Sequence, residues 1–428
     1  MKTRFINFFD LNNNDAAWEH FKKNIAFFGA ILLVIGLVFS PALQSIGVAL
    51  IFSAYFFKNN TNIQFEKDVL SLGLIALLGI SFLSGIYGHN HDEYWKKIIV
   101  KLPFVLLGIS FLGTSLFNQD KINKILSIFS WSVFVAALIT CINYLLNFNT
   151  INEQLLHSKP IYILYAVERA DNRQVNHIYF SIMLAFAIWC SYYLYKIKFG
   201  KKYNYVMLLQ CIGLIILLHV IGARTGLLGF YASTIVALLW VIIKEKKYKT
   251  GLLFGVFLLT LFFSAYKFLP AWQNRLANTK EDLGKMKEGK NINHYSISMR
   301  KEALKTAWEI YCKNPILGVG AGDLQQAMEQ QYTADQSILI PENRKLPHNQ
   351  FIQELSTTGI LGLIILCSIF ILPFRYKNAW NNLMLISFLV ICFSAFQVES
   401  VLERQVGITF FSFFYLLIPL VKNKASEK

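Results

Sequence analysis

Long apolar stretches separated by shorter polar segments recur along the chain from residue 24 to residue 421. Most are near twenty residues long, the length at which a helix crosses a hydrocarbon core about 30 Å thick. The pattern predicts an all-α polytopic membrane protein with about twelve transmembrane helices. They are expected at residues 24–40, 42–57, 69–87, 98–117, 125–147, 175–195, 204–222, 225–243, 251–269, 351–373, 383–397 and 405–421.

One polar segment, residues 270–350, is far longer than the others and divides the chain into three parts. Residues 1–269 hold the first nine predicted spans, and residues 351–428 hold the last three and a short tail. Within the polar segment, the residues from Ser296 to Lys313 predict an amphipathic helix that ends at Asn314-Pro315. We expect this helix to lie on the membrane surface or to cap the bundle. Its apolar residues recur at helical spacing: Ala303, Leu304, Ala307, Trp308 and Tyr311.

Composition agrees with this picture, because 55% of the residues are hydrophobic and 15% are charged, against about 25% in soluble proteins. The net charge of +16 would suggest nucleic acid in a soluble protein, but here we interpret it as topology. With a cytoplasmic N-terminus, the cytoplasmic segments carry 21 Lys and Arg residues and the short outer loops carry seven. This asymmetry follows the positive-inside rule. It predicts cytoplasmic termini and puts the 270–350 segment outside, with no nucleic-acid partner.

The chain offers few motifs for metal or nucleotide chemistry. It contains no CxxC and no HExxH, and one of its six cysteines, Cys312, falls in the long polar segment. We therefore expect neither a disulfide framework nor a metal cofactor. The cluster HNHDE at 89–93 is better explained as a solvated loop. GVGAG at 318–322 lacks the strand and the Lys-Ser/Thr of a nucleotide-binding loop, so a turn is the better interpretation.

Two residues are the strongest candidates for chemistry. Arg224 sits in a tight outer turn between two apolar spans, where an unpaired guanidinium is costly, and its shape suits phosphate oxygens. His348 follows Pro347 at the start of a predicted span, and Pro is preferred in the first turn of a helix. In that turn the helix dipole disfavours a charged imidazolium, so His348 is expected to be neutral and able to act as a general base.

Four further residues are weaker candidates on the same outer face. Arg300 begins the amphipathic helix, where most Arg residues face water. Glu354 lies further into the span that His348 precedes, and is expected to orient a neighbour, pair with an Arg, or pack as a polar helix residue. Glu399 and Arg404, together with Glu403, form the last outer turn and would make local ion pairs or help to bind an acceptor.

Three of these stretches together resemble the O-antigen ligase / O-antigen polymerase superfamily. They are ARTG at the tight outer turn, Arg300 separated by seven residues from Trp308 in the helix that leads into NPILGVGAGD, and HNQFIQELSTTGILGLI after the long segment. The resemblance covers residues 175–420 and is most specific at 296–365. It implies a helical membrane fold of about a dozen spans, with a large periplasmic loop that ends in a His followed by an Asn, here His348 and Asn349.

The resemblance also implies a function in the bacterial inner membrane with a periplasmic active site. Ligase members transfer a glycan from undecaprenyl diphosphate to a sugar hydroxyl of lipid A-core, without a metal. Polymerase relatives extend glycan on the lipid carrier, and a third branch glycosylates protein Ser/Thr. In this chain Arg224 and Arg300 would hold the donor diphosphate and His348 would activate the acceptor hydroxyl, with Asn349, Glu354, Glu399 and Arg404 as further substrate-binding residues.

A transporter is the alternative from a different class. It would place ionisable groups near the bilayer midplane and would show internal symmetry. The candidate residues gather instead at the predicted outer face, which favours an enzyme over a transporter. Among the enzymes the ligase branch is our first hypothesis, and a polymerase is harder to exclude.

Overall fold

The computed structural model describes residues 15–56, 65–113, 116–156, 161, 177–200, 204–287, 292–293, 295–376 and 379–421. Within these ranges the chain forms α-helices and short 3-10 helices, and no strand. The prediction of an all-α fold is therefore confirmed. The predicted cytoplasmic ends and most of the predicted outer loop at 148–174 lie outside the described residues.

The helices follow the predicted apolar stretches closely. In chain order they are α1 (Asp15–Phe39), α2 (Pro41–Tyr55), α3 (Phe65–Leu83), α4 (His91–Lys101), α5 (Pro103–Phe111), α6 (Gln119–Leu146), α7 (Phe148–Leu156), α8 (His177–Lys196), α9 (Asn204–Ile221), α10 (Arg224–Glu245), α11 (Tyr248–Phe268), α12 (Pro270–Lys287), α13 (Ser296–Lys313), α14 (Leu324–Ala334), α15 (Gln350–Ile371), α16 (Leu383–Phe396) and α17 (Gln405–Leu417). A short 3-10 helix, η7 (Val401–Glu403), stands between α16 and α17.

Among the described residues, eight helices are long and apolar enough to cross a membrane: α1, α3, α6, α8, α9, α10, α11 and α15. The apolar helices α2, α16 and α17 are shorter. The predicted span at 98–117 is not one helix, because α4 ends at Lys101 and α5 begins at Pro103. Proline has no N–H to continue the helical hydrogen bonds, so the chain starts a new helix there. The chain is a helical membrane protein, and the count of twelve spans stays a prediction.

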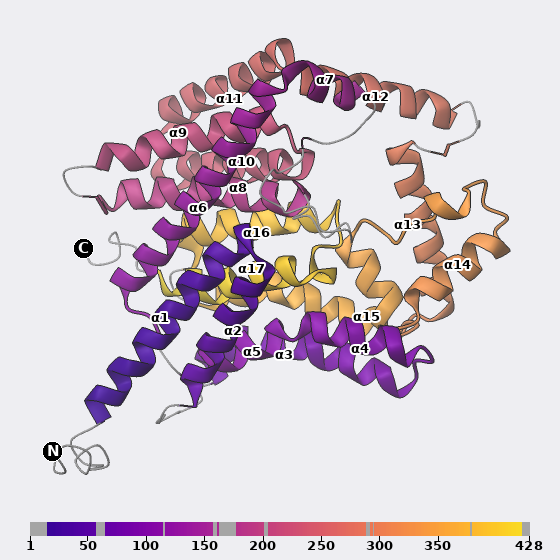
Figure 1. Ribbon diagram of the computed structural model, residues 1–428, viewed down its shortest axis with the longest axis horizontal. Helices are drawn as coiled ribbons and strands as arrows, with labels where there is room; N and C mark the ends of the chain where they lie inside the picture. The colour runs from indigo at the N-terminus through magenta and orange to yellow at the C-terminus, as the bar shows by residue number, and fades with distance from the viewer. Residues whose placement is uncertain are drawn as a thin grey trace.

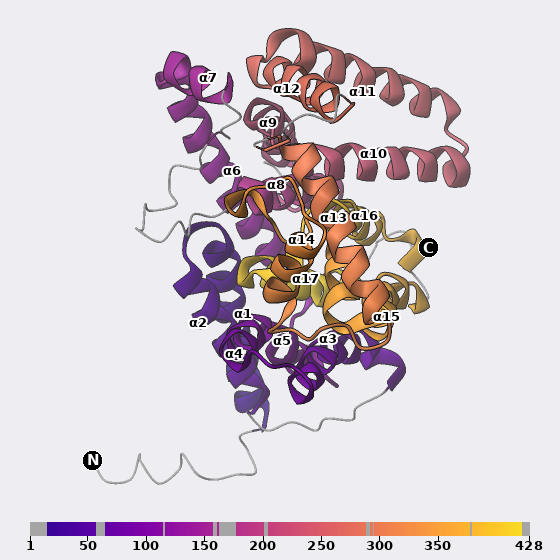
Figure 2. The ribbon, with the colours of Figure 1, turned by 90° about the vertical axis from the view of Figure 1, so that its right-hand side faces the viewer.

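Most of the long helices run along one direction, and the polar segment 270–350 covers one end of them. In Figure 1 the helices α8 to α11 lie in the upper part, α3 to α5 lie along the bottom, and α16 and α17 lie between. The helix α13 runs across the right-hand end, from α12 down to α15, with which it makes extensive contact. Figure 2 shows the same crossing from that end.

The core of the bundle is aromatic and lies between α6, α8, α16 and α17. Phe414 stands 4.6 Å from Phe129 and 4.9 Å from Phe186, measured between ring centroids, and Phe388 packs 5.1 Å from Phe186. All four side chains are fully buried. Since aromatic rings bury large apolar areas and pack best edge to face, they tie the last two helices to the middle of the chain.

The predicted amphipathic helix is confirmed as α13, but its buried face differs from the predicted one. Ala303, Ala307 and Ile310 are buried, whereas Trp308 is 48% exposed. The buried stripe is the one that packs on α15, where the hydroxyl of Ser356 donates to the carbonyl of Ala307 at 2.9 Å. Trp308 follows Ala307 directly and is therefore rotated about 100° away from the buried stripe, so its side chain faces outward.

The helix α15 breaks at Gly359, and the stretch that contains GVGAG fills the break. Gly359 has φ +69°, and a Cβ there would lie 2.1 Å from the carbonyl oxygen of Ile316, so only glycine fits. Three hydrogen bonds replace those lost in the helix: Val319 N to Ser356 O at 3.0 Å, Gly320 N to Thr357 O at 2.8 Å, and Ile360 N to Pro315 O at 2.9 Å. The glycines therefore serve packing and turning, in agreement with the sequence interpretation.

Candidate active site

His348 lies directly before α15 and not within it. The side-chain oxygen of Asn349 accepts hydrogen bonds from the backbone N–H groups of Phe351, at 2.9 Å, and Ile352, at 3.0 Å, so Asn349 is the N-cap. The prediction that Pro347 puts His348 in the first helical turn is wrong by two residues. Asn is a strong capping residue because its side chain satisfies the orphan N–H groups of the first turn, and the helix begins after it.

The partner of His348 is Glu399, from the segment between α16 and α17. The Nδ1 atom of His348 lies 3.2 Å from one carboxylate oxygen of Glu399 and 3.3 Å from the other. The Glu399 side chain is 11% exposed and the His348 side chain 32% exposed. When a carboxylate accepts a hydrogen bond from the N–H at Nδ1, the other ring nitrogen, Nε2, carries no proton and can act as the base. The pair can therefore accept a proton at a partly exposed atom.

The segment that carries Glu399, residues 397–404, is tied to the start of α15 by hydrogen bonds; we call it the 397–404 turn. These bonds run from Asn349 Nδ2 to Gln397 O at 3.0 Å, from Ser400 Oγ to Pro347 O at 2.5 Å, and from Leu402 N to Gln350 Oε1 at 2.7 Å. They flank His348 and Glu399 on both sides. Asn349 thus both caps α15 and holds the 397–404 turn.

Glu403, at the end of η7, joins the 397–404 turn to α4. Its carboxylate lies 2.9 Å from the Nζ of Lys97 and 3.7 Å from the Nζ of Lys101, which is buried. Burial alone would raise the pKa of Glu403, but the ammonium groups of Lys101 and Lys97 outweigh it and lower the pKa. Glu403 therefore pairs with lysines far away in the sequence.

Glu354 and Arg404 occupy different surroundings. Glu354 is buried in α15, accepts a hydrogen bond from the hydroxyl of Thr358 at 2.6 Å, and acts electrostatically on Lys101. Arg404 is exposed and stands at the N-cap position of α17, within electrostatic range of Tyr179. Glu354 is thus close to Lys101, the last residue of α4.

Arg224 and Arg300 lie on two different helices, within electrostatic range of one another. Arg224 is exposed as the first residue of α10, and Arg300 lies near the start of α13. Arg300 and Asp282 both act electrostatically on Arg224, Arg300 by repulsion and Asp282 by attraction. Two guanidinium groups held near one another are typical of a site for an anion with several oxygens.

Asp282, in α12, fixes the position of Arg300. Its carboxylate accepts hydrogen bonds from the N–H of Ile297 at 2.6 Å and from the N–H of Ser298 at 3.2 Å. The residue at the N-cap position of α13 is Tyr295, whose side chain makes no capping bond. Asp282 therefore caps α13 from another helix and keeps the start of α13 beside α12.

The first turns of α8 stand between the arginine pair and the His348–Glu399 pair. On one side, the N–H of Gly226 donates to Ser181 Oγ at 3.0 Å, and a Cβ on Gly226 would lie 2.4 Å from the Ser181 carbonyl oxygen. On the other side, the hydroxyl of Tyr179 donates to Ser400 O at 3.5 Å. Arg224 and His348 are thus at the same end of the bundle and are connected through one helix.

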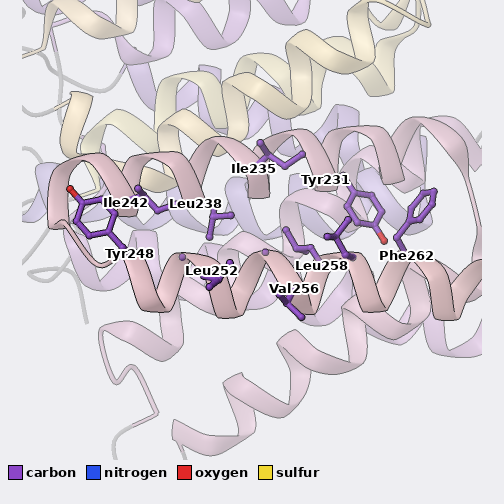
Figure 3. Close-up of a pocket in the computed structure, with 12 residues that line it drawn as sticks. Tyr231, Ile235, Leu238, Ile242, Tyr248, Leu252, Val256, Leu258 and Phe262 are labelled. Carbon is purple, nitrogen blue, oxygen red and sulfur yellow. The ribbon is translucent and has the colours of Figure 1, made fainter.

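An apolar groove of about 560 Å³ runs between α10 and α11, as Figure 3 shows. It begins at Tyr231, two turns after Arg224, and continues along α10 past Ile235 and Leu238 to Ile242. Its other wall, α11, exposes much of its surface, including Leu252 and Leu253. In a membrane this groove opens to lipid.

Sequence reasoning missed Tyr179, Asp282, Lys97 and Lys101. The two lysines carried a usable signal, because they are four residues apart and Lys101 lies within an otherwise apolar run. Asp282 is one of several charged residues in a polar segment, and Tyr179 is one of twenty tyrosines. Neither is distinguishable before the helices are placed.

The HNHDE cluster begins α4, where Asn90 is the N-cap and Glu93 pairs with Lys96 at 2.6 Å. Over the part of the chain that the structure describes, no three His, Cys, Asp or Glu side chains gather as metal ligands would.

Part of the chain matches a known protein family. Residues 205–367 match the family model described as O-antigen ligase, a range that contains Arg224, Arg300, His348, Asn349 and Glu354 but neither Glu399 nor Arg404. No curated relative matches the chain. The family match confirms the predicted resemblance and suggests a membrane glycosyltransferase of the O-antigen ligase or polymerase type, acting on lipid-linked glycans.

Proposed function

Because residues 205–367 match the family model described as O-antigen ligase, we propose that this protein is an O-antigen ligase. It transfers a glycan from undecaprenyl diphosphate to a hydroxyl of lipid A-core. The observation that carries the proposal is the contact of His348 with Glu399, at the same end of the bundle as the Arg224–Arg300 pair. Together they offer a proton acceptor and a site for the anionic diphosphate leaving group.

In the proposed reaction the acceptor hydroxyl oxygen attacks the anomeric carbon of the donor glycan. The hydroxyl proton passes to Nε2 of His348 as the new carbon–oxygen bond forms. Glu399 holds the Nδ1 proton and stabilises the imidazolium that results. Since the acceptor displaces the leaving group in one step, the anomeric configuration is inverted.

The bond from the anomeric carbon to the diphosphate breaks at the same time, and the diphosphate leaves with the electron pair. Arg224 and Arg300 bind its oxygens and stabilise the charge that develops. The N-terminus of α10 adds to this, because the N–H groups of a first turn favour anions. An anion between the two arginines also relieves their mutual repulsion.

The lipid part of the donor follows from the same geometry. The groove between α10 and α11 starts two turns after Arg224 and has apolar walls. We assign the polyprenyl chain to this groove, with its diphosphate at Arg224. The polyprenyl chain enters the groove laterally from the bilayer, and α11 forms one wall of that entrance.

The remaining candidates flank this arrangement, and their substrate-binding roles stay predictions. Asn349 holds the 397–404 turn against α15, Arg404 is the exposed last residue of that turn, and Glu354 lies nearer Lys101. The bacterial inner membrane, cytoplasmic termini and a periplasmic active site belong to the same proposal. They are supported by the Lys and Arg asymmetry of the loops.

Two relatives share this chemistry: a polymerase, which adds glycan to glycan on the lipid carrier, and a protein O-oligosaccharyltransferase. The test is to delete the protein from its own cell and identify what accumulates. A ligase predicts polymerised glycan on undecaprenyl diphosphate. Accumulation of single repeat units would show a polymerase instead, and loss of glycan from protein with intact lipopolysaccharide would show the third activity.

A further inference from the structure

The turn that leads out of α13, residues 314–318, carries two large apolar side chains that do not face the protein. Ile316 is 63% exposed and Leu317 is 46% exposed. We call residues 314–318 the 314–318 turn. Although it belongs to the long polar segment, we propose that it is seated in the bilayer, at the boundary between the headgroups and the hydrocarbon.

The level of this turn relative to the membrane follows from its contact with α15. From Gln353 to Gly359 every residue of α15 is buried within the protein, and the first exposed residue of the helix is Leu361. Leu361 and Ile364 then face outward as a lipid-facing surface would. The carbonyl of Ile316 stands against Gly359, two residues before Leu361. The turn therefore lies where the lipid-facing surface of α15 begins.

Three carbonyl groups of the 314–318 turn accept hydrogen bonds, which lowers the cost of an apolar environment, where unsatisfied polar groups are costly. The carbonyl of Asn314 accepts from Gly318 N at 3.0 Å, and that of Pro315 accepts from Ile360 N at 2.9 Å. The carbonyl of Leu317 accepts from the hydroxyl of Tyr87 at 2.5 Å. Pro315 has no N–H to satisfy.

The side chains that flank the 314–318 turn also suit a position at the boundary between the headgroups and the hydrocarbon. Lys313, directly before the turn, directs its ammonium to Gln331 of α14 at 2.5 Å. Trp308 is about half exposed on α13, beside Tyr311 at 5.1 Å between ring centroids. Trp and Tyr are enriched at the interface between membrane and water. Apolar side chains at the turn, aromatic rings behind it and a charge directed away form a typical interfacial anchor.

The consequence concerns α13, which crosses the end of the bundle. Asp282 accepts hydrogen bonds from its first turn, and the 314–318 turn follows directly after its last residue, Lys313. An anchor in the lipid fixes the height of α13, and with it Arg300, above the membrane. This inference depends on α15 crossing the bilayer and not on the proposed reaction, so the two can fail separately.

The test places an environment-sensitive fluorophore at the turn in the full-length protein. Ile316→Cys is made in a Cys312→Ser background, because Cys312 is exposed, and labelled with NBD in proteoliposomes. Ile338→Cys is the matched control, because Ile338 is also an isoleucine of the polar segment and is 58% exposed. Its carbonyl accepts a hydrogen bond from Asn293, which places it near the start of α13, at the opposite end of that helix from Ile316. The Cys312→Ser protein alone is the labelling blank.

We expect the label at position 316 to lose fluorescence to phospholipids that carry a doxyl group at carbon 5, and little to aqueous iodide. The label at 338 is expected to show the opposite order. Iodide quenching at 316 equal to that at 338 would overturn the proposal, and so would quenching by neither agent, which would mean that protein covers the turn. Size-exclusion chromatography of each variant establishes that it is folded before labelling.

Discussion

The two sides of the candidate active site are built in opposite ways. On the base side, hydrogen bonds join the start of α15 to the 397–404 turn, and Glu403 pairs with Lys97 and with the buried Lys101. On the donor side, α11 touches α10 across an open apolar groove and leaves most of its own surface exposed. Hydrogen bonds and ion pairs, which are directional, hold the base side together. Apolar contacts, which are not directional, form the donor side.

This difference matches what each side has to do in the proposed reaction. A general base works only within hydrogen-bond reach of the proton that it accepts, so small displacements are costly. A polyprenyl chain is long and flexible and needs a slot that admits it from the bilayer, not a fixed geometry. Substitutions on the base side should therefore reduce the rate of transfer, and substitutions in the groove should reduce the affinity for the donor.

The largest effect is expected from His348→Ala. Loss of the proton acceptor should lower kcat by about 10²- to 10⁴-fold, with little change in KM for the donor. Glu399→Gln should give a smaller loss, since the ring remains but its orientation and charge stabilisation weaken. His91→Ala, at the exposed start of α4, is the control and should keep full activity. A fully active His348→Ala protein would show that His348 is not the general base.

The next effect is expected from Arg224. Arg224→Ala should lower kcat/KM by about 10²- to 10³-fold, because one fewer donor group stabilises the leaving diphosphate. Arg224→Lys should recover only part of this loss, since a single ammonium cannot grip two oxygens at once. Arg375→Ala, an exposed Arg at the far end of the α15 segment, is the matched control. Steady-state kinetics with a lipid-linked donor measure all three.

A milder effect is expected from filling the groove with Gly255→Leu. A Cβ at Gly255 would meet only Leu238 Cδ2, at 3.8 Å, so the larger side chain enters the groove without pushing the backbone. The KM for an undecaprenyl-linked donor should rise, and the KM for a donor with a short lipid chain should not. Gly79→Leu is the control, because a Cβ at Gly79 would meet no other part of the protein within 4 Å, and Gly79 lies on α3, away from the groove. If Gly255→Leu changes the KM for both donors equally, the lipid chain does not bind in this groove.

The smallest effect on activity, but a clear one on stability, is expected from Glu403→Gln. The pKa of Glu403 is lowered in the folded protein from its ordinary value of 4.5. The ion pairs therefore stabilise the fold fully above that value, and their contribution is lost as the pH falls below it. Removing one partner of a buried pair costs about 3–5 kcal/mol.

Thermal unfolding in detergent from pH 7 to pH 3 measures this. The wild type should lose Tm below about pH 4.5, whereas Glu403→Gln should start with a lower Tm at pH 7 and lose less on acidification. Parallel curves for the two proteins would show that the lysine pair does not hold the 397–404 turn.

The sequence predicted the helices well because apolar length is a strong signal for membrane-spanning helices. It failed where a local rule outweighed that signal: Pro103 divides one predicted span, and the capping side chain of Asn349 moves the start of α15 past His348. The break at Gly359 was also not predicted, since a single glycine in an apolar run gives no warning of a loop packed against it.

For the site, the sequence and the family resemblance picked out His348, Arg224 and Arg300, but not how they are held. The partner of His348 is 51 residues away in the sequence, and the cap of the helix that carries Arg300 comes from α12. Such contacts depend on how the helices are arranged, and a list of candidate residues cannot supply them.

The central claim is tested most directly by reconstitution of the transfer reaction. Purified protein in proteoliposomes is mixed with undecaprenyl diphosphate-linked glycan and lipid A-core, with EDTA and without ATP. We predict glycan attached to lipid A-core by the wild type, in inverted configuration, and none by His348→Ala. A requirement for ATP, or equal product from His348→Ala, would contradict the account.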